Sequence, residues 1–207
     1  MSTALRVVEA HDQRVWNGAM LRSAGADLLQ GWEWGEFKRR SGWIPQRWVA
    51  LRDDQPVAGV QILARRVMGV SSLYAPRGPW WHDEAALAAL IRALRRTLAW
   101  RAPFLRVDPL IADAKPLTQL GFRPAPRQIQ PKASIVVDLT RAEEDLMAGF
   151  DRQVRYNIRL AERKGVTVTR GGAESVEAFW NLLNVTATRK GFAERNLSYF
   201  KDLCDVF

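Results

Sequence analysis

The chain has 207 residues, of which 47% are hydrophobic and nine are tryptophan, so it holds enough apolar material for one large packed domain or two small ones. This composition excludes an intrinsically disordered protein. Lys and Arg number 31 against 22 Asp and Glu, and the formal charge of +9 favours polyanionic partners: nucleic acid, phosphorylated metabolites or acidic lipid.

We expect no targeting segment in this sequence. The first residues, MSTALRVVEAHDQR, lack the apolar core of a signal peptide, and no run approaches the ~20 apolar residues of a transmembrane helix. The single cysteine, Cys204, suits a reducing compartment. We therefore expect a cytoplasmic protein. With only His11 and His82 there is little material for a Ser-His-Asp triad or a metal site, and we expect no metal.

The first 140 residues predict a mixed α/β unit. The apolar runs WIPQRWVAL and PVAGVQILARR, joined by a turn at 52–55, indicate a hairpin. Asp83 is placed to cap a helix with apolar residues at helical spacing. The other predicted elements are two helices over 12–42 ending at Ser41-Gly42, strands at 71–74, 103–109 and 133–139, and a short helix at 115–120. This order indicates an α/β fold with a mixed α+β sheet, of the GNAT acyltransferase type.

The second half begins in a similar way. Thr140 and Glu143 have capping-box spacing and predict a helix that is interrupted near 149–151 and ends at Lys164-Gly165. A strand, GVTVTR, a helix over 174–189 and another from Asn196 follow. Phe179, Leu182 and Leu183 form a bare apolar face on the helix 174–189, which favours a second domain truncated at Phe207 over a mere appendage.

Four arginines form the clearest cationic pattern: Arg155, Arg159 and Arg163 lie in VRYNIRLAERKG and Arg152 lies two residues before it, so that they recur at spacings of three and four. Because they repel one another, they predict contact with phosphate or an RNA backbone. A solvated helix face is the alternative.

Three further segments offer candidate binding or catalytic groups. Trp34, with the neighbouring aromatic and cationic residues of WEWGEFKRR, can stack a base and bind its phosphate, or can simply pack a helix. The segment APRGPWW is predicted as a loop, and in it Arg77 stands beside Gly78, where a backbone can approach a ligand closely or where a rigid turn is needed. Asp108 ends the strand in LRVDPL and could act as a general base or orient an amine, although aspartates at strand ends often form turns.

Five segments in order resemble the FemABX family. They are LLQGWEWGEFKRRSGW, YAPRGPWW, LRVDP, the stretch from QPKASIVVDL to RYNIRLAERKGVTV, and KGFAERNLSYF. The resemblance implies tandem GNAT-like domains, here 1–131 and an incomplete 132–207. It implies that Lys38 contacts the nucleotide-sugar precursor, that Arg195 and Tyr199 hold its diphosphate, that Asp108 assists the reacting amine, and that Arg155 and Asn157 belong to a family motif.

The resemblance also implies a reaction and its partners. An amine of a peptidoglycan precursor, lipid II or UDP-MurNAc-pentapeptide, would attack the ester of aminoacyl-tRNA as co-substrate, with no other cofactor and with peripheral contact at the inner membrane surface. We expect the 207-residue chain alone to be inactive. An acyl-CoA-dependent GNAT enzyme is one alternative, although APRGPWW lacks the glycines of a pyrophosphate loop. A non-catalytic RNA-binding module is the other.

Overall fold

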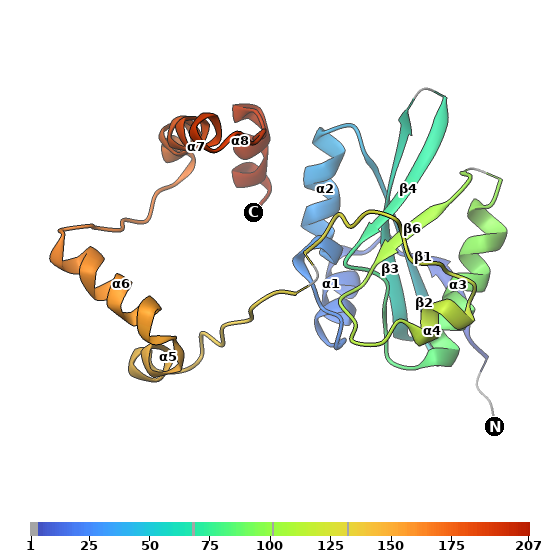
Figure 1. The fold of residues 1–207 in the computed structure, drawn as a ribbon. Coiled ribbons are helices and arrows are strands. Elements are labelled where there is room, and N and C mark those ends of the chain that lie inside the picture. Colours follow the sequence, from blue (N-terminus) through green and yellow to red (C-terminus); the bar gives the residue numbers. More distant parts are fainter. Residues whose placement is uncertain (1–3, 68, 101, 132) are drawn as a thin grey trace. The chain divides into compact units, whose positions relative to one another are not determined.

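The computed structural model describes residues 4–67, 69–100, 102–131 and 133–207, and these form two compact units (Figure 1). The first unit comprises Met1–Gln130 with Glu194–Phe207, and the second comprises Pro131–Ala193. Lys132, where the predicted second domain begins, lies outside the described residues. The assignment of an incomplete second GNAT-like domain to 132–207 stays a prediction.

The first unit is built on a mixed sheet whose described part has six strands. The order is β1-β2-β3-β4-β6, with β5 paired to β3. Neighbours from β1 to β4 are antiparallel, whereas β4 and β6 are parallel. The strands are β1 (Arg6–Glu9), β2 (Ile44–Arg52), β3 (Gln55–Val67), β4 (Val70–Pro76), β5 (Trp80–Trp81) and β6 (Leu105–Asp108). The predicted mixed α/β class and the predicted hairpin are confirmed.

Local chemistry explains the hairpin turn. Asp53 and Asp54 join β2 to β3 with φ angles of 50° and 58°, so both occupy the left-handed region that a two-residue turn of the primed type requires. Aspartate tolerates this region better than most residues because its short side chain can bond locally. The β2–β3 pairing therefore closes directly at Arg52 and Gln55.

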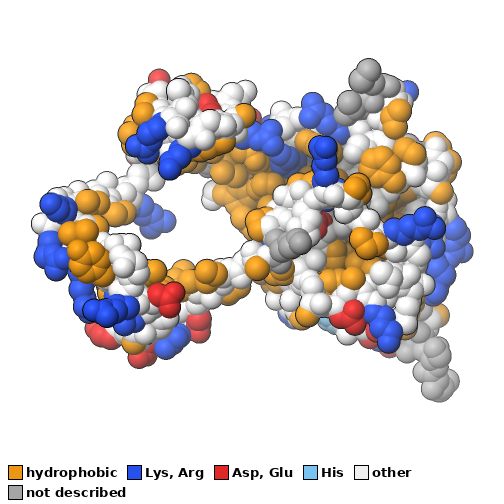
Figure 2. All heavy atoms as spheres, viewed as in Figure 1, with side chains coloured by type: hydrophobic (Ala, Val, Ile, Leu, Met, Phe, Trp, Pro, Cys, Tyr) orange, Lys and Arg blue, Asp and Glu red, His pale blue; other side chains and the backbone are white. Residues whose placement is uncertain are grey.

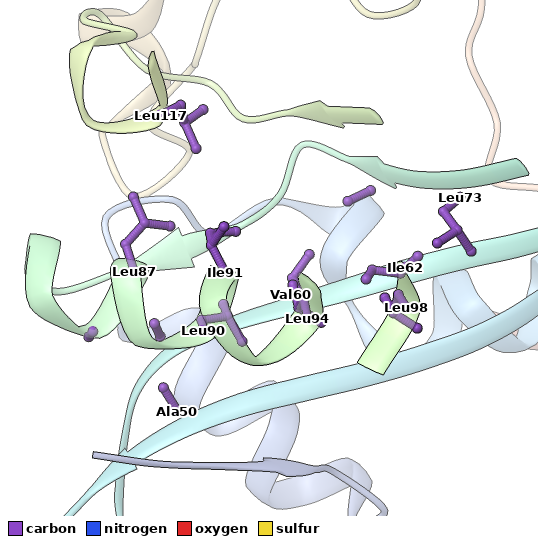
Figure 3. Packing of buried hydrophobic residues seen from close by; sticks show 13 residues of the cluster. Ala50, Val60, Ile62, Leu73, Leu87, Leu90, Ile91, Leu94, Leu98 and Leu117 are labelled. Atoms are coloured by element: carbon purple, nitrogen blue, oxygen red, sulfur yellow. The ribbon is translucent and has the colours of Figure 1, made fainter. Parts of the chain in front are cut away.

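Helices cover both faces of the sheet (Figure 1). On one face lie α1 (Gln13–Leu21), the short 3-10 helix η1 (Leu28–Gln30) and α2 (Trp32–Arg40), and on the other lies α3 (Glu84–Leu98). The Asp83 side chain accepts a hydrogen bond from the Ala86 amide, which confirms the predicted cap. Figure 3 shows the apolar face of α3 packed over β2, β3 and β4. Its buried members are Leu87, Leu90, Ile91, Leu94 and Leu98. Beyond β6 the chain forms the short helix α4 (Lys115–Gln119).

The second unit is helical in its described part. It contains α5 (Glu143–Gly149), α6 (Arg152–Arg163), the 3-10 helix η2 (Ala173–Ser175) and α7 (Val176–Lys190). The predicted break between α5 and α6 is confirmed, and Phe179 and Leu182 are exposed as expected. The last helix, α8 (Leu197–Val206), is capped by Asn196 and belongs to the first unit. No helix in the described ranges is both long and apolar enough to cross a membrane.

Three local predictions were wrong. The β-branched runs at 133–139 and 165–170 form no strand, because no described strand pairs with them; Ile135 and Val136 remain 93% and 88% exposed. The capping box fails because α5 begins one residue after Ala142, while the Thr140 hydroxyl donates to Asp138. Trp80 and Trp81, predicted as loop, form β5.

Candidate functional site

Lys38 lies near the end of α2 among three aromatic rings. Its ammonium nitrogen is 5.6 Å from the ring centre of Trp34, 5.4 Å from that of Phe37 and 5.2 Å from that of Tyr199. The Phe37 and Tyr199 rings meet edge to face with centres 4.7 Å apart. These are distances at which a cation is attracted to the face of a ring. These four residues form one group, which we call the Lys38 cluster: Trp34, Phe37, Lys38 and Tyr199.

A second cation stands beside the Lys38 cluster. The Arg195 guanidinium carbon is 5.4 Å from the Tyr199 ring centre. Burial lowers the pKa of the Lys38 ammonium below its usual value, and the nearby positive charges of Arg195 and Arg65 lower it further. Burial also raises the pKa of the Tyr199 phenol. The site is thus a partly buried concentration of positive charge with a neutral phenol.

Ion pairs hold α8 against α2. The Arg40 guanidinium contacts Asp202 at 3.2 Å and Asp205 at 3.0 Å. Asn196 caps α8 by accepting a hydrogen bond from the Tyr199 amide at 3.1 Å. A hollow of about 380 Å³ opens between the end of α2 and the start of α8, with Arg195 and Tyr199 in its wall. Arg40 and Asp202, 162 positions apart in sequence, therefore line the same hollow.

Asp108 lies at the end of β6, in register with Pro76 of β4. One of its carboxylate oxygens accepts hydrogen bonds from the Tyr74 hydroxyl and from the Gln130 amide, each at 3.3 Å. The Gln130 side chain donates to the Tyr74 hydroxyl at 3.0 Å, and burial raises the pKa of that phenol. Asp108 also lines a hollow of about 710 Å³ along β6. The carboxylate is therefore oriented by its neighbours and open to a ligand.

Arg77 follows β4 in a constrained turn. It has a φ of 55°, in the left-handed region, and its side chain is buried with its Nε atom 3.8 Å from an Asp27 carboxylate oxygen. The amide of Asp108 donates to the carbonyl of Gly78 at 3.2 Å. Arg77 and Asp108 thus belong to the adjoining ends of β4 and β6, while Trp34, Lys38, Arg195 and Tyr199 gather at α2 and α8.

The arginines of α6 are mostly exposed, and Lys and Arg side chains are prominent on this part of the surface (Figure 2). Arg155 is the exception, because its guanidinium turns back to donate to the carbonyls of Ala148 and Phe150 at the end of α5. Arg163 lies 6.0 Å from the Tyr156 ring centre. The exposed cations of this helix are Arg152, Arg159 and Arg163, and Arg155 has a structural contact at the helix break.

Comparison with known proteins covers nearly the whole chain. A sequence model of the FemAB family matches residues 118–207. The lipid II:glycine glycyltransferase of Staphylococcus haemolyticus (strain JCSC1435) is 31% identical over 198 residues, which cover 86% of this chain and 47% of that protein. The enzyme of the same name from Staphylococcus aureus is 30% identical, with 87% and 47% covered. The chain belongs to the FemABX family.

A solved structure extends the FemABX assignment to the fold. The crystal structure of FemX matches 98% of this chain with a TM-score of 0.85 and 27% sequence identity, and the match covers 55% of the FemX chain. This FemABX chain spans about half the length of the curated relatives it matches. Its mixed α/β fold is therefore shared with FemX.

Sequence reasoning missed three side chains that surround the candidate groups in this FemABX protein. Arg65 contributes charge at Lys38, and Tyr74 and Gln130 hold Asp108. Tyr74 stands within the YAPRGP motif, where a polar aromatic before a ligand loop could have been noticed. Arg65 and Gln130 give no such signal, because their roles depend on which strands and loops become neighbours. The described residues contain no group of three His, Cys, Asp or Glu that could hold a metal ion.

Proposed function

We propose that this FemABX chain supplies the precursor-binding part of an aminoacyltransferase, which moves an amino acid from aminoacyl-tRNA onto the stem or bridge peptide of a peptidoglycan precursor. The observation that carries the proposal is the positive charge of Lys38 together with that of Arg195 and Arg65 beside the Lys38 cluster. Lys38, Arg195 and Arg65 are close enough for the two arginines to lower the pKa of the lysine. An anion bound among them would relieve this repulsion, and a diphosphate offers several charge-assisted hydrogen bonds.

The aromatic rings complete a site suited to such a ligand. Trp34, Phe37 and Tyr199 provide apolar faces beside the cations, so a sugar or a base attached to the diphosphate can pack against a ring. Both UDP-MurNAc-pentapeptide and lipid II present a diphosphate linked to a sugar. The relatives named lipid II:glycine glycyltransferase favour the second acceptor. A lipid-linked acceptor would bring the protein to the inner face of the membrane, where its charge of +9 is attracted to anionic lipid.

The proposed reaction is aminolysis of an ester. The neutral amine of the acceptor attacks the carbonyl carbon of the aminoacyl ester, the bond to the ribose oxygen breaks, and an amide and a free tRNA hydroxyl form. Asp108 could accept a hydrogen bond from the attacking amine, because Tyr74 and Gln130 already hold one of its oxygens in a fixed direction. The aminoacyl ester is already activated, so the proposal requires no further cofactor.

The loop after β4 argues against acyl-CoA as the donor. Acyl-CoA enzymes of the GNAT type cradle pyrophosphate with backbone N–H groups. Here Pro76 and Pro79 have no N–H, and the Gly78 amide already donates to the Ala75 carbonyl at 3.4 Å. The exposed arginines on α6 favour a charged tRNA as the donor, because they can contact its phosphates.

Transfer of a labelled amino acid tests the proposal directly. The full-length protein should move label from charged tRNA to lipid II or to UDP-MurNAc-pentapeptide, and RNase treatment of the donor should stop the transfer. An acyl-CoA donor should give no product. Transfer from acyl-CoA, or RNA binding without transfer to either precursor, would overturn the proposed reaction.

Contact between α6 and tRNA gives a separate prediction. Replacing the exposed Arg159 by glutamine should weaken tRNA binding by roughly 3- to 10-fold near physiological salt and reduce the slope of log K against log salt by about 1, since one phosphate contact is lost. Arg14→Gln, at an exposed position on α1, is the matched control and should change neither quantity. Equal effects of both substitutions would mean that α6 provides only general positive charge.

A further inference from the structure

The sheet has a gap where β4 leaves β3. The described β3–β4 pairing begins with Val67 opposite Val70 and ends with Leu63 opposite Tyr74. On the same edge, β3 next pairs with β5, where Gly59 lies opposite Trp80. The side chain of Gln30, from η1, enters the gap. Its Oε1 atom accepts from the Gln61 amide at 2.7 Å, and its Nε2 atom donates to the carbonyls of Pro76 at 2.7 Å and Gln61 at 3.2 Å.

Gln30 thus replaces the ladder hydrogen bonds that the two strands would otherwise make with each other. Its side chain is 0% exposed, so the three backbone groups that it contacts could not turn to water instead. Gln61 returns the interaction, because its side chain, also 0% exposed, donates to the carbonyls of Gly31 at 3.0 Å and Leu29 at 3.3 Å. The hydrogen bonds of these two glutamines attach η1 to the centre of β3.

The loop that carries Arg77 rests on this glutamine. A Cβ atom placed on Gly78 would lie 2.5 to 2.6 Å from the amide group of Gln30, which no real side chain allows. The backbone of Gln30 is fixed in turn, because the Trp16 indole donates to its carbonyl at 2.8 Å and Trp16 is buried. The absence of a side chain at Gly78 lets the loop approach the amide directly.

We propose that Gln30 is a positioning residue, whose amide spaces β4 from β3 and so fixes the loop 76–79, with Arg77, relative to the start of α2. This inference rests on the proposed function only in assuming that the loop and α2 serve precursor binding. The spacing itself is independent of any ligand. Because Gln30 ends η1 two residues before α2 begins, one side chain sets the relation between two candidate substrate-binding elements.

Gln30→Glu tests the hydrogen bonds at constant shape. The introduced carboxyl, when protonated, can accept from Gln61 and donate to Pro76, but its ionised form would face two carbonyl oxygens. Its pKa in the folded protein should therefore be raised, so the deficit in melting temperature relative to the natural protein should be small below the ordinary glutamate pKa of ~4.3 and grow to its full size as pH rises through the raised value. Gln119→Glu, at an exposed position, should show no such trend.

Loop order and ligand affinity distinguish positioning from mere stability. In Gln30→Glu at neutral pH, well below its melting temperature, the amides of Gly78 and Asp108, bonded to Ala75 and Gly78, should exchange with deuterium at least 10-fold faster. The full-length variant should bind UDP-MurNAc-pentapeptide at least 5-fold more weakly, and lower pH should restore part of this affinity. Natural exchange rates at both amides in a destabilised variant would overturn the proposal.

A double-mutant cycle gives a readout that needs no ligand. Gly78→Ala should lower the melting temperature strongly in the natural background and much less in a Gln30→Ala background, where the added methyl group has room. Additive effects would show that the loop does not rest on Gln30. If the natural full-length protein fails to bind the precursor while exchange and coupling behave as expected, the proposed function fails and the positioning role of Gln30 stands.

Discussion

Replacing Lys38 by methionine should weaken binding of UDP-MurNAc-pentapeptide to the full-length protein by roughly 10- to 100-fold, since a hydrogen bond between charged groups is worth about 1.5 to 3 kcal/mol. Methionine keeps the length and apolar stem of the side chain and removes only the charge. Isothermal calorimetry measures the change. The free energy of unfolding should not fall, because the substitution also removes a charge that is partly buried beside Arg195 and Arg65.

The pH dependence of binding provides a second signature of Lys38. Because its pKa in the free protein is lowered and a bound anion would raise it, affinity should be greatest below the free pKa and should fall as pH rises through it, at a pH below the ordinary lysine value of ~10.4. Lys38→Arg keeps its charge throughout and should lack this decline.

A ligand without the diphosphate is the matched control for Lys38. Its affinity should be equal for the natural protein and for Lys38→Met. An unchanged affinity of Lys38→Met for the diphosphate-containing precursor would remove the Lys38 cluster from the binding site.

Gly35→Ala should destabilise the protein by about 2 to 4 kcal/mol, even though alanine favours a helix interior over glycine by about 1 kcal/mol. A Cβ atom at this position of α2 would lie 2.3 Å from both the Arg47 Nη2 atom and the Gln61 Oε1 atom. Arg47 is 4% exposed, and the same nitrogen donates to Glu36 and to the Trp32 carbonyl at 2.9 and 2.8 Å. Overpacking costs about 1 to 3 kcal/mol, and disturbing a buried ion pair adds to it.

Gly18→Ala is the control for Gly35→Ala. It also lies inside a helix, α1, but its added Cβ would meet only the flexible end of Arg22 at 3.4 Å. Helix propensity should therefore dominate, and this variant should be more stable by about 0.5 to 1 kcal/mol. Urea denaturation of both variants gives the comparison. A stabilised Gly35→Ala would mean that Arg47 and Gln61 can move aside at little cost.

Residues whose structure depends on nearby sequence were predicted well. The Asp83 cap, the two-residue turn at Asp53 and Asp54, and the buried face of α3 all follow from spacing and local chemistry. The runs at 133–139 and 165–170 have equally strong β-branched character, yet they form no strand because a strand needs a partner. Propensity alone does not contain that information.

The candidate site shows the same limit. The family resemblance singled out Lys38 and Tyr199, and their contact at 5.2 Å joins residues that no spacing rule connects. Gln61 did carry a signal, because a glutamine within the apolar run PVAGVQILA predicts a buried and hydrogen-bonded amide. Its partner Gln30 lies in a different element, and the register of β3 and β4 decides that they meet. Prediction from sequence therefore found the charged and aromatic candidates of the family motifs, and it missed the side chains whose roles depend on which elements become neighbours.

Cys204 lies exposed on α8, and it is the only cysteine of the chain. It is followed directly by Asp205, whose ion pair with Arg40 holds α8 to α2. A thiol-reactive fluorophore can therefore be attached to this 207-residue chain at one position, on the helix that also carries Tyr199 of the Lys38 cluster. A change in the fluorophore's emission during a titration would report ligand binding near α8.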